Sequence, residues 1–236
     1  YGIAPICSVD EKGYMNEEAG PECQGLFFED CSKKIITMMN EKGCLLAVDK
    51  ITHSYPHDDR LKKKVIFRAA KQWFCSIEKI REQLLDQIQN HVTWHNEWGQ
   101  IRMYNMIKDR GDWCISRQRL WGVPIPILYC EDGTPIMEKE VFDHVADLID
   151  EFGSNVWFEK EAMELIPEGF TCPHCGGKTF TKETDTLDCW FDSGSTHYAS
   201  LMKDTPELWP ADVYLEGADQ YRGWFQSSLL TSVGAL

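Results

Sequence analysis

DVYLEGADQYRGWFQSS, residues 212–228, is the stretch that decides the fold of this chain. An apolar segment breaks at an acid-glycine turn and runs into a helical pattern, which predicts a buried strand, a turn at Gly217 and a helix. Ligands of an open α/β sheet bind beyond the carboxyl ends of its strands, where glycine lets the backbone approach and an acid accepts hydrogen bonds from ribose hydroxyls. Gly217 and Asp219 fit these roles, although a plain strand-turn-helix capped by Asp219 explains the same residues equally well.

The composition predicts a globular protein without a large nucleic-acid surface. Hydrophobic residues make up 43% and aromatic residues 12% of the 236 positions, which is typical of a chain with a packed core. The formal net charge of -14 opposes an extensive phosphate-binding face, because such faces are built from Lys and Arg. Any RNA contact is therefore expected to be local. The basic stretch at 60–64 is either such a contact or, as the pattern favours, a solvated charge run.

The sequence also indicates the compartment. No apolar run approaches the roughly 20 residues of a membrane span, and no charged-then-apolar leader opens the chain. Ten cysteines stand at irregular spacings, unlike the framework of a small secreted disulfide protein. We expect a cytoplasmic monomer without membrane contact.

Four further blocks extend this interpretation along the chain. They are THSYPH at 52–57, QWF at 72–74, DWCISRQRLWGVPIPI at 112–127 and LDCWFDSG at 187–194, followed by the run at 212–228. In this order they resemble the isoleucyl-tRNA synthetases, a family of class I aminoacyl-tRNA synthetases. Valyl and leucyl enzymes are the alternatives within the class, and the valyl enzymes lack the EGADQYRGW phrase. The two ATP signatures of the family, His-x-Gly-His and Lys-Met-Ser-Lys-Ser, are absent from the sequence, so the resemblance implies an internal fragment.

The resemblance implies an α/β fold in two parts. Residues 1–62 would form the C-terminal part of a β-rich editing domain, and residues 63–236 the central part of a Rossmann-like class I catalytic domain, with a small insertion at about 130–183. The family activates isoleucine with ATP and Mg²⁺ to isoleucyl-adenylate, transfers it to tRNA(Ile) and removes mischarged valine. Without the ATP signatures, the fragment alone is expected to be inactive.

The resemblance also implies where substrate lies. Trp190 and Trp224 would form a rigid apolar slot for the isoleucine side chain. Four residues of the run at 212–228 would border the adenosine of isoleucyl-adenylate: Glu216, Gly217, Asp219 and Gln220. Without the resemblance, two tryptophans of a chain that has nine are more often core residues than ligand contacts. No protein nucleophile is implied, because the reaction depends on positioning and charge stabilisation.

Cys172 and Cys175 form a CPHCGG knuckle of the zinc-ribbon type. One such pair supplies two of the four ligands of a structural zinc ion, and Cys130 is a candidate for a third. No second Cys-x-x-Cys occurs, so the pattern favours a vestigial knuckle over a complete zinc site. A non-catalytic zinc-ribbon module that binds RNA is the rival interpretation, and it would need a second cysteine pair and a basic face.

Hydrophobic periodicity predicts the remaining elements. Helices are expected at 30–43, 77–88, 99–109 and 141–149, and strands at 44–51, 65–76 and 122–129. Arg117 and Arg119 are placed on a helix, where they diverge. They are therefore expected to be structural ion-pair partners, with a contact to the acceptor end of tRNA as the alternative.

Overall fold

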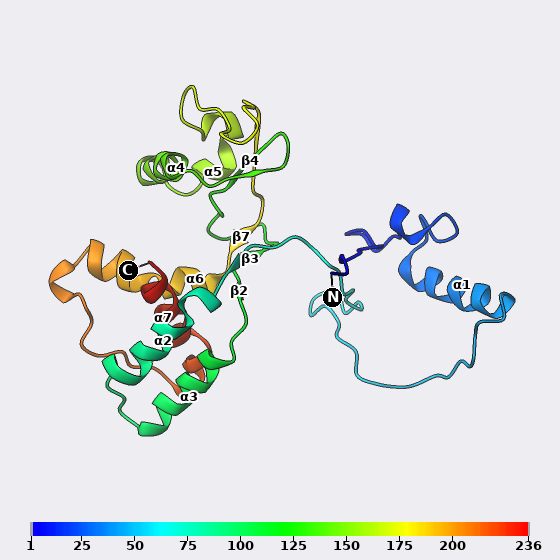
Figure 1. Cartoon of the computed structure of the whole chain (residues 1–236), viewed down its shortest axis with the longest axis horizontal. Coiled ribbons are helices and arrows are strands. Elements are labelled where there is room, and N and C mark those ends of the chain that lie inside the picture. The colour runs from blue at the N-terminus through cyan, green and yellow to red at the C-terminus, as the bar shows by residue number, and fades with distance from the viewer. Residues whose placement is uncertain (1, 236) are drawn as a thin grey trace. The chain divides into compact units, whose positions relative to one another are not determined.

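The computed structural model describes residues 2–235, which divide into two compact units between Lys71 and Gln72 (Figure 1). No helix in the described part of the chain combines the length and the apolar character needed to cross a membrane. Each unit is held by its own contacts and has its own architecture.

Unit 1, residues 1–71, is built around α1 (Phe28–Glu41), which follows the short 3-10 helix η1 (Glu17–Ala19). The helix predicted at 30–43 is confirmed, but it begins two residues earlier, so Asp30 lies in the first turn instead of capping it. A carboxylate there still favours the helix, because it faces the positive end of the helix dipole. Gly43 has a φ of 69° and follows the helix end as predicted.

The described part of unit 1 has little core. Its buried apolar side chains are Cys23 and Cys31, whereas Ile35 and Ile36 on α1 are 41% and 42% exposed. The strand predicted at 44–51 is wrong, because those residues pair with no strand in the described chain and Leu46 is fully exposed. Strand-forming side chains hold an extended conformation only when a partner strand and a packed face are present.

Unit 2 contains short strands and longer helices. Its described strands are β1 (Phe74–Cys75), β2 (Trp113–Cys114), β3 (Ser116–Arg117), β4 (Leu128–Cys130), β5 (Pro135–Ile136), β6 (Phe180–Lys182) and β7 (Thr186–Leu187). Its described α-helices are α2 (Arg81–Asp86), α3 (Glu97–Lys108), α4 (Lys139–Phe152), α5 (Val156–Glu159), α6 (Cys189–Gly194) and α7 (Trp224–Ala235). Its described 3-10 and π-helical turns are η2 (Glu78–Ile80), η3 (Gln87–His91), η4 (Ala162–Glu164), η5 (His197–Lys203), η6 (Pro206–Leu208) and η7 (Ala218–Arg222).

The sheets of unit 2 are small and antiparallel. Strand β1 pairs with β2, β3 pairs with β7, and β4 lies between β5 and β6. The observed architecture is thus a mixture of helices and small sheets, and the described residues contain no parallel Rossmann-like sheet. The predicted strand at 122–129 shrinks to β4, because Pro124, which has no N–H to donate, makes only an isolated bridge to Thr186.

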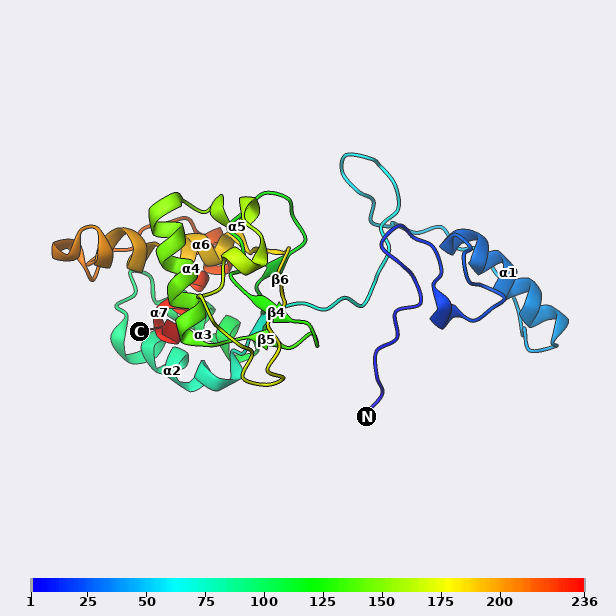
Figure 2. The ribbon, with the colours of Figure 1, turned by 90° about the horizontal axis from the view of Figure 1, so that it is seen from above.

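Two cores hold unit 2 together. The first gathers α2, α3 and α7 around buried side chains: Ile77, Leu84, Leu85, Ile88, Met103, Ile107, Trp113, Tyr221 and Leu230. The second is formed by the segment from β4 to β6, and Figure 2 shows α4 and α5 beside its strands. The helices predicted at 77–88, 99–109 and 141–149 are confirmed, and Val141 and Val145 on α4 are buried as their spacing predicts.

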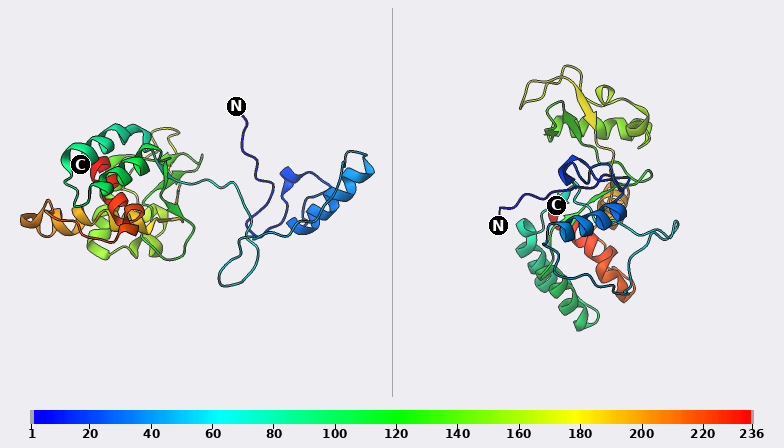
Figure 3. Two further views of the ribbon diagram at one scale, coloured as in Figure 1. Left: turned by 90° about the horizontal axis from the view of Figure 1, so that it is seen from below. Right: turned by 90° about the vertical axis from the view of Figure 1, so that its right-hand side faces the viewer.

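The stretch at 212–228 follows the prediction only in its second half. Residues 212–215 do not form a buried strand: they pair with no strand in the described chain, and Val213 and Leu215 are 72% and 85% exposed. The helix is confirmed, because Gly217 precedes η7 and α7 follows directly. Turn η5, orange in Figure 3, projects from the body of the unit before this stretch begins.

Candidate functional site

Two of the predicted site residues, Trp190 and Gln220, lie against Gly223, which stands between η7 and Trp224, the first residue of α7. A Cβ atom at this position would lie 2.9 Å from the Trp190 ring and 2.5 Å from Gln220 Oε1. The backbone N–H of Trp224 donates to the same Gln220 Oε1 at 3.0 Å. A glycine is needed at this position because the Trp190 ring and the Gln220 amide occupy the space of a side chain, and not because the backbone has a positive φ. Sequence reasoning missed Gly223, although its place between Arg222 and Trp224, just before a predicted helix, is a usable signal.

Trp224 lies in the first turn of α7 and links this helix to the end of α6. Its Nε1 donates to the Ser193 carbonyl at 3.0 Å and to Thr196 Oγ1 at 3.3 Å. Its ring stacks on Tyr214, with ring centroids 4.5 Å apart and planes 15° apart. Tyr214 therefore joins the candidate site, and no feature of the sequence singled it out.

Trp190 lies in the first turn of α6, directly after β7 and Asp188, and is 40% exposed. The tryptophans Trp113 and Trp157, in contrast, are 7% and 1% exposed and belong to the two cores. Trp190 is thus not a core residue in this chain.

The four predicted adenosine neighbours form a chain of contacts along the turn. Gly217 N–H donates to Glu216 Oε2 at 3.2 Å, and Gln220 Nε2 donates to Asp219 Oδ2 at 3.1 Å. Asp219 makes no capping bond to η7, whose N-cap is Gly217, so the interpretation of Asp219 as a helix cap is not supported. Glu216 and Asp219 are exposed and offer carboxylate oxygens to solvent.

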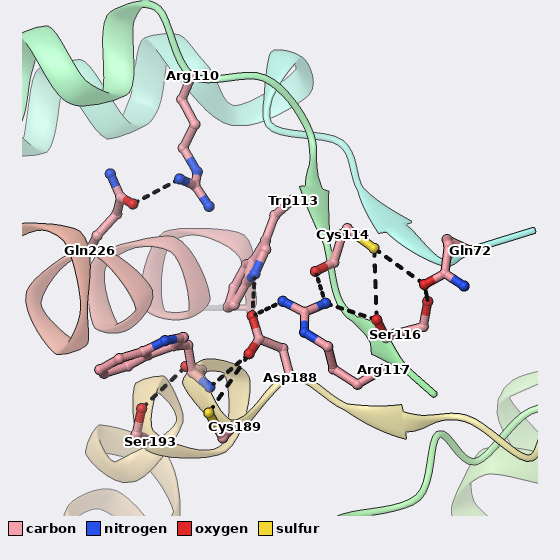
Figure 4. A network of polar contacts seen from close by, with 11 residues as sticks. Gln72, Arg110, Trp113, Cys114, Ser116, Arg117, Asp188, Cys189, Ser193 and Gln226 are labelled. Atoms are coloured by element: carbon pink, nitrogen blue, oxygen red, sulfur yellow. Dashed lines mark hydrogen bonds and ion pairs between the residues drawn. The ribbon is translucent and has the colours of Figure 1, made fainter. Parts of the chain in front are cut away.

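Asp188 organises the side of the site that Figure 4 shows. Its buried carboxylate accepts hydrogen bonds from Trp113 Nε1 at 3.0 Å, from Arg117 Nη2 at 2.8 Å and from the Trp190 backbone N–H at 3.3 Å. The last bond caps α6 and fixes the position of Trp190 in the first turn of that helix. Arg117 is the structural ion-pair partner that was predicted, but it lies on β3 and not on a helix. Arg119 is exposed and forms no ion pair with a described residue.

A cavity of about 210 Å³ lies beside this network in unit 2. Its walls include Trp190 and Gly223, and three arginines reach it: Arg110, Arg117 and Arg222. Arg110 Nη1 donates to Gln226 Oε1 at 2.8 Å. Burial, together with the nearby charge of Arg222, lowers the pKa of the Arg110 guanidinium from its usual value.

The knuckle cysteines are joined by Cys130, as the sequence suggested. The Sγ atoms of Cys130, Cys172 and Cys175 all lie within 4.8 Å of one another, and those of Cys130 and Cys175 are 3.0 Å apart. Cys130 and Cys172 are buried, and Cys175 is exposed. The hydrogen bond with Cys130 raises the pKa of the Cys175 thiol to about 12, whereas backbone N–H groups outweigh burial and lower that of Cys172.

Comparison with known proteins adds a family to this geometry. A family model described as class I tRNA synthetases (I, L, M and V) matches residues 14–235. An isoleucine–tRNA ligase of Lacticaseibacillus casei is 58% identical over 236 residues, covering 100% of this chain and 25% of the relative. Those of Geobacillus thermodenitrificans and Bacillus subtilis are 57% and 55% identical over 233 residues, covering 99% of this chain and 25% of each relative. The chain spans about a quarter of the length of these curated relatives, and it belongs to the class I tRNA synthetases of the I, L, M and V family.

Proposed function

We propose that this chain is the segment of an isoleucyl-tRNA synthetase that binds the isoleucine side chain and the adenosine of isoleucyl-adenylate. The observation that carries this proposal is that Trp190 and Gln220 lie against Gly223, the residue before Trp224, whose backbone N–H donates to Gln220. The names of the relatives, all isoleucine–tRNA ligases, supply the amino acid. The whole enzyme would use isoleucine, ATP and tRNA(Ile), and mischarged valine would be removed by its editing domain.

The two indoles are suited to a branched aliphatic group. The Trp190 ring lies against Gly223, and Trp224 is the next residue in the chain. Hydrogen bonds fix Trp190 in the first turn of α6 and Trp224 in the first turn of α7. A slot of rigid rings binds isoleucine well, but it rejects valine only through one missing methylene, worth about 1–3 kcal/mol, a figure established for this family of enzymes and not obtained from this site. Limited rejection of valine is the reason for a separate editing step.

The turn before α7 would receive the adenosine. Glu216 and Asp219 present exposed carboxylate oxygens that can accept hydrogen bonds from ribose hydroxyls, and the missing side chain of Gly217 leaves space for the Asp219 carboxylate. The residues of this chain would bind and orient the adenylate. ATP and Mg²⁺ are implied by the family, but both ATP signatures are absent from the sequence, so no step at the ATP phosphates is assigned to these residues.

We assign residues 1–62 to the end of the editing domain and residues 63–236 to the catalytic domain, with an insertion at about 130–183. Two observations support this division. The chain separates into two units after Lys71, and the segment from β4 to β6 has a core of its own.

Replacing Trp224 tests the isoleucine slot. In a full-length synthetase that carries this segment, Trp224→Ala removes an apolar wall of the slot. We expect the Michaelis constant for isoleucine to rise about tenfold or more, because the lost contact is comparable to that of one or two methylene groups. The matched control is Trp157→Ala, because Trp157 is 1% exposed in the second core. That variant should lose about 3–5 kcal/mol of stability and keep its affinity for isoleucine. Isoleucine-dependent kinetics and thermal melting are measured for both. An early-melting Trp224 variant with an unchanged Michaelis constant would assign Trp224 to the core.

The cysteine cluster supports a second, structural role. We propose that Cys130, Cys172 and Cys175 hold a zinc ion and so tie β4 to the knuckle. Three thiolates fit zinc, and a structural zinc ion takes a fourth ligand that the described cluster does not supply. The ion would supply stability and take no part in the reaction.

Elemental analysis of purified chain tests this role. We expect bound zinc that Cys130→Ser removes and Cys189→Ser does not, since Cys189 is exposed and lies outside the cluster. Because only three cysteines are available, we expect the ion to dissociate more readily than from a four-cysteine site, with less than one equivalent after dialysis. Equal zinc content in the two variants would contradict the site.

A further inference from the structure

The cavity beside Trp190 carries an excess of positive charge. Three arginines and one carboxylate reach it. The carboxylate, Asp188, is engaged by Arg117 at 2.8 Å and also accepts a bond from Trp113. In the part of the chain that the structure describes, no ion pair joins Arg110 or Arg222 to a carboxylate. Neither Arg110 nor Arg222 therefore has an ion-pair partner of its own, and the one nearby anion that acts on Arg110, Asp188, is already paired with Arg117.

Arg110 is the inner of these two groups. It is half-buried just after the end of α3, and the hydrogen-bond partner of its guanidinium is the neutral amide of Gln226. Its Nε atom is buried and has no hydrogen-bond partner among the described residues. A guanidinium held away from water without a counter-charge is costly, and a bound anion would remove that cost.

Arg222 is the outer group. It is exposed, it stands on η7 and it lines the same cavity as Arg110, close enough that its charge lowers the pKa of Arg110. Two like charges facing one cavity repel each other, and an anion between them converts that repulsion into attraction. The chain as a whole carries -14, so this cavity is a local exception to its charge.

We propose that the cavity binds a phosphate group between Arg110 and Arg222, with the Arg117–Asp188 pair as its wall. Two uncompensated charges match a phosphate, which carries about -1.5 to -2 at pH 7, better than they match a single carboxylate. Guanidinium forks also fit phosphate oxygens in pairs. The volume of about 210 Å³ is below the roughly 300–1,000 Å³ of pockets for whole small molecules, so a phosphate or pyrophosphate group fits and a complete nucleotide does not.

The phosphate has two possible sources, a free anion such as pyrophosphate or the backbone of a single-stranded RNA. Both present phosphate oxygens to the arginines, but each backbone phosphate of an RNA carries one negative charge, so the charge match favours the free anion. The cavity shares Trp190 and Gly223 with the proposed isoleucine slot. The test below uses arginine variants and no isoleucine, so a failure of the phosphate site is distinguishable from a failure of the isoleucine slot.

Calorimetric titration of the chain with inorganic pyrophosphate at low salt, without isoleucine or ATP, tests the site. We expect one site per chain, weakened about ten- to hundredfold by Arg222→Gln and by Arg110→Gln, because each removes charged hydrogen bonds. Arg119→Gln is the matched control, since Arg119 is an exposed arginine that does not line the cavity. Thermal melting accompanies each variant. Arg110 is packed against Gln226, so its variant can lose stability, whereas exposed Arg222 gives a result independent of folding.

Competition identifies the source. If a short single-stranded RNA displaces pyrophosphate, and if the affinity of that RNA falls with rising salt and in the Arg222→Gln variant, the site binds an RNA backbone. If pyrophosphate binds and RNA does not displace it, the ligand is a free anion. Absence of binding by both probes, or binding that Arg222→Gln leaves unchanged, would overturn the proposal.

Discussion

At the scale of single residues, the candidate site depends on the absence of a side chain. Gly223 lets the Trp190 ring and the Gln220 amide lie against the start of α7. Asp188 then fixes Trp190 from the other side by capping α6, while it holds Arg117 and Trp113. One buried carboxylate and one glycine thus set the position of an exposed indole.

Gly223→Ala should disturb this site more than it disturbs the fold. The new methyl group would meet Trp190 at 2.9 Å and Gln220 at 2.5 Å, so both side chains must move. We expect a loss of about 1–3 kcal/mol, typical of overpacking, and a changed tryptophan fluorescence spectrum. Gly111→Ala is the control, because a Cβ there meets no atom within 4 Å and its φ is not in the left-handed region. Chemical denaturation and fluorescence are measured for both. Equal behaviour of the two variants would show that close approach at Gly223 is not required.

The residues of the site were only partly accessible to sequence reasoning. Trp190, Trp224 and the turn residues could be named because they stand in a phrase shared with a family. Tyr214 and Gly223 stand in the same run, but the contacts that bring them into the site do not follow from it, because the fold decides which ring stacks on Trp224 and which side chains lie against Gly223. The cavity arginines come from the segment just after α3, from β3 and from η7, which lie far apart in the sequence, and no local pattern predicts that they share a cavity.

At the scale of elements, helices were predicted well and strands poorly. The helices α1, α3 and α4 each carry their own periodic apolar face or end signal, which a short window of sequence contains. A strand is defined by its partner. Residues 44–51 and 212–215 have the composition of strands but pair with nothing in the described chain, whereas β1 exists because Phe74 and Cys75 meet β2.

The segment from β4 to β6 shows how an inserted piece stays ordered. Trp157 and Leu165 are fully buried in a core that residues 128–180 supply by themselves. Trp73 Nε1 also donates to Tyr129 and to Glu183, both at 3.0 Å, so the chain just before β1 is joined to β4 and to the residue after β6. A structural zinc ion at Cys130 would add a third tie to the same segment.

At the scale of the whole molecule, the two units differ in how much apolar surface they bury. Unit 2 has two cores with many fully buried aliphatic side chains, and the described part of unit 1 buries mainly Cys23 and Cys31. Since burial of apolar surface is the main favourable term in folding, the stability of the chain resides in unit 2.

Hydrogen exchange should reveal this difference directly. Residues 45–57 donate no backbone–backbone hydrogen bond within the described chain, so their amides should exchange at nearly unprotected rates. The amides of α3 are the internal control, because Met103 and Ile107 there are 1% and 0% exposed in the helical core, and they should exchange orders of magnitude more slowly. Mass spectrometry of peptides covering 45–57 and 97–108 measures both in one sample. Protection at 45–51 comparable to that of α3 would mean that a paired strand forms there in solution, as the sequence pattern predicted, and that the stability of unit 1 is greater than its buried side chains indicate.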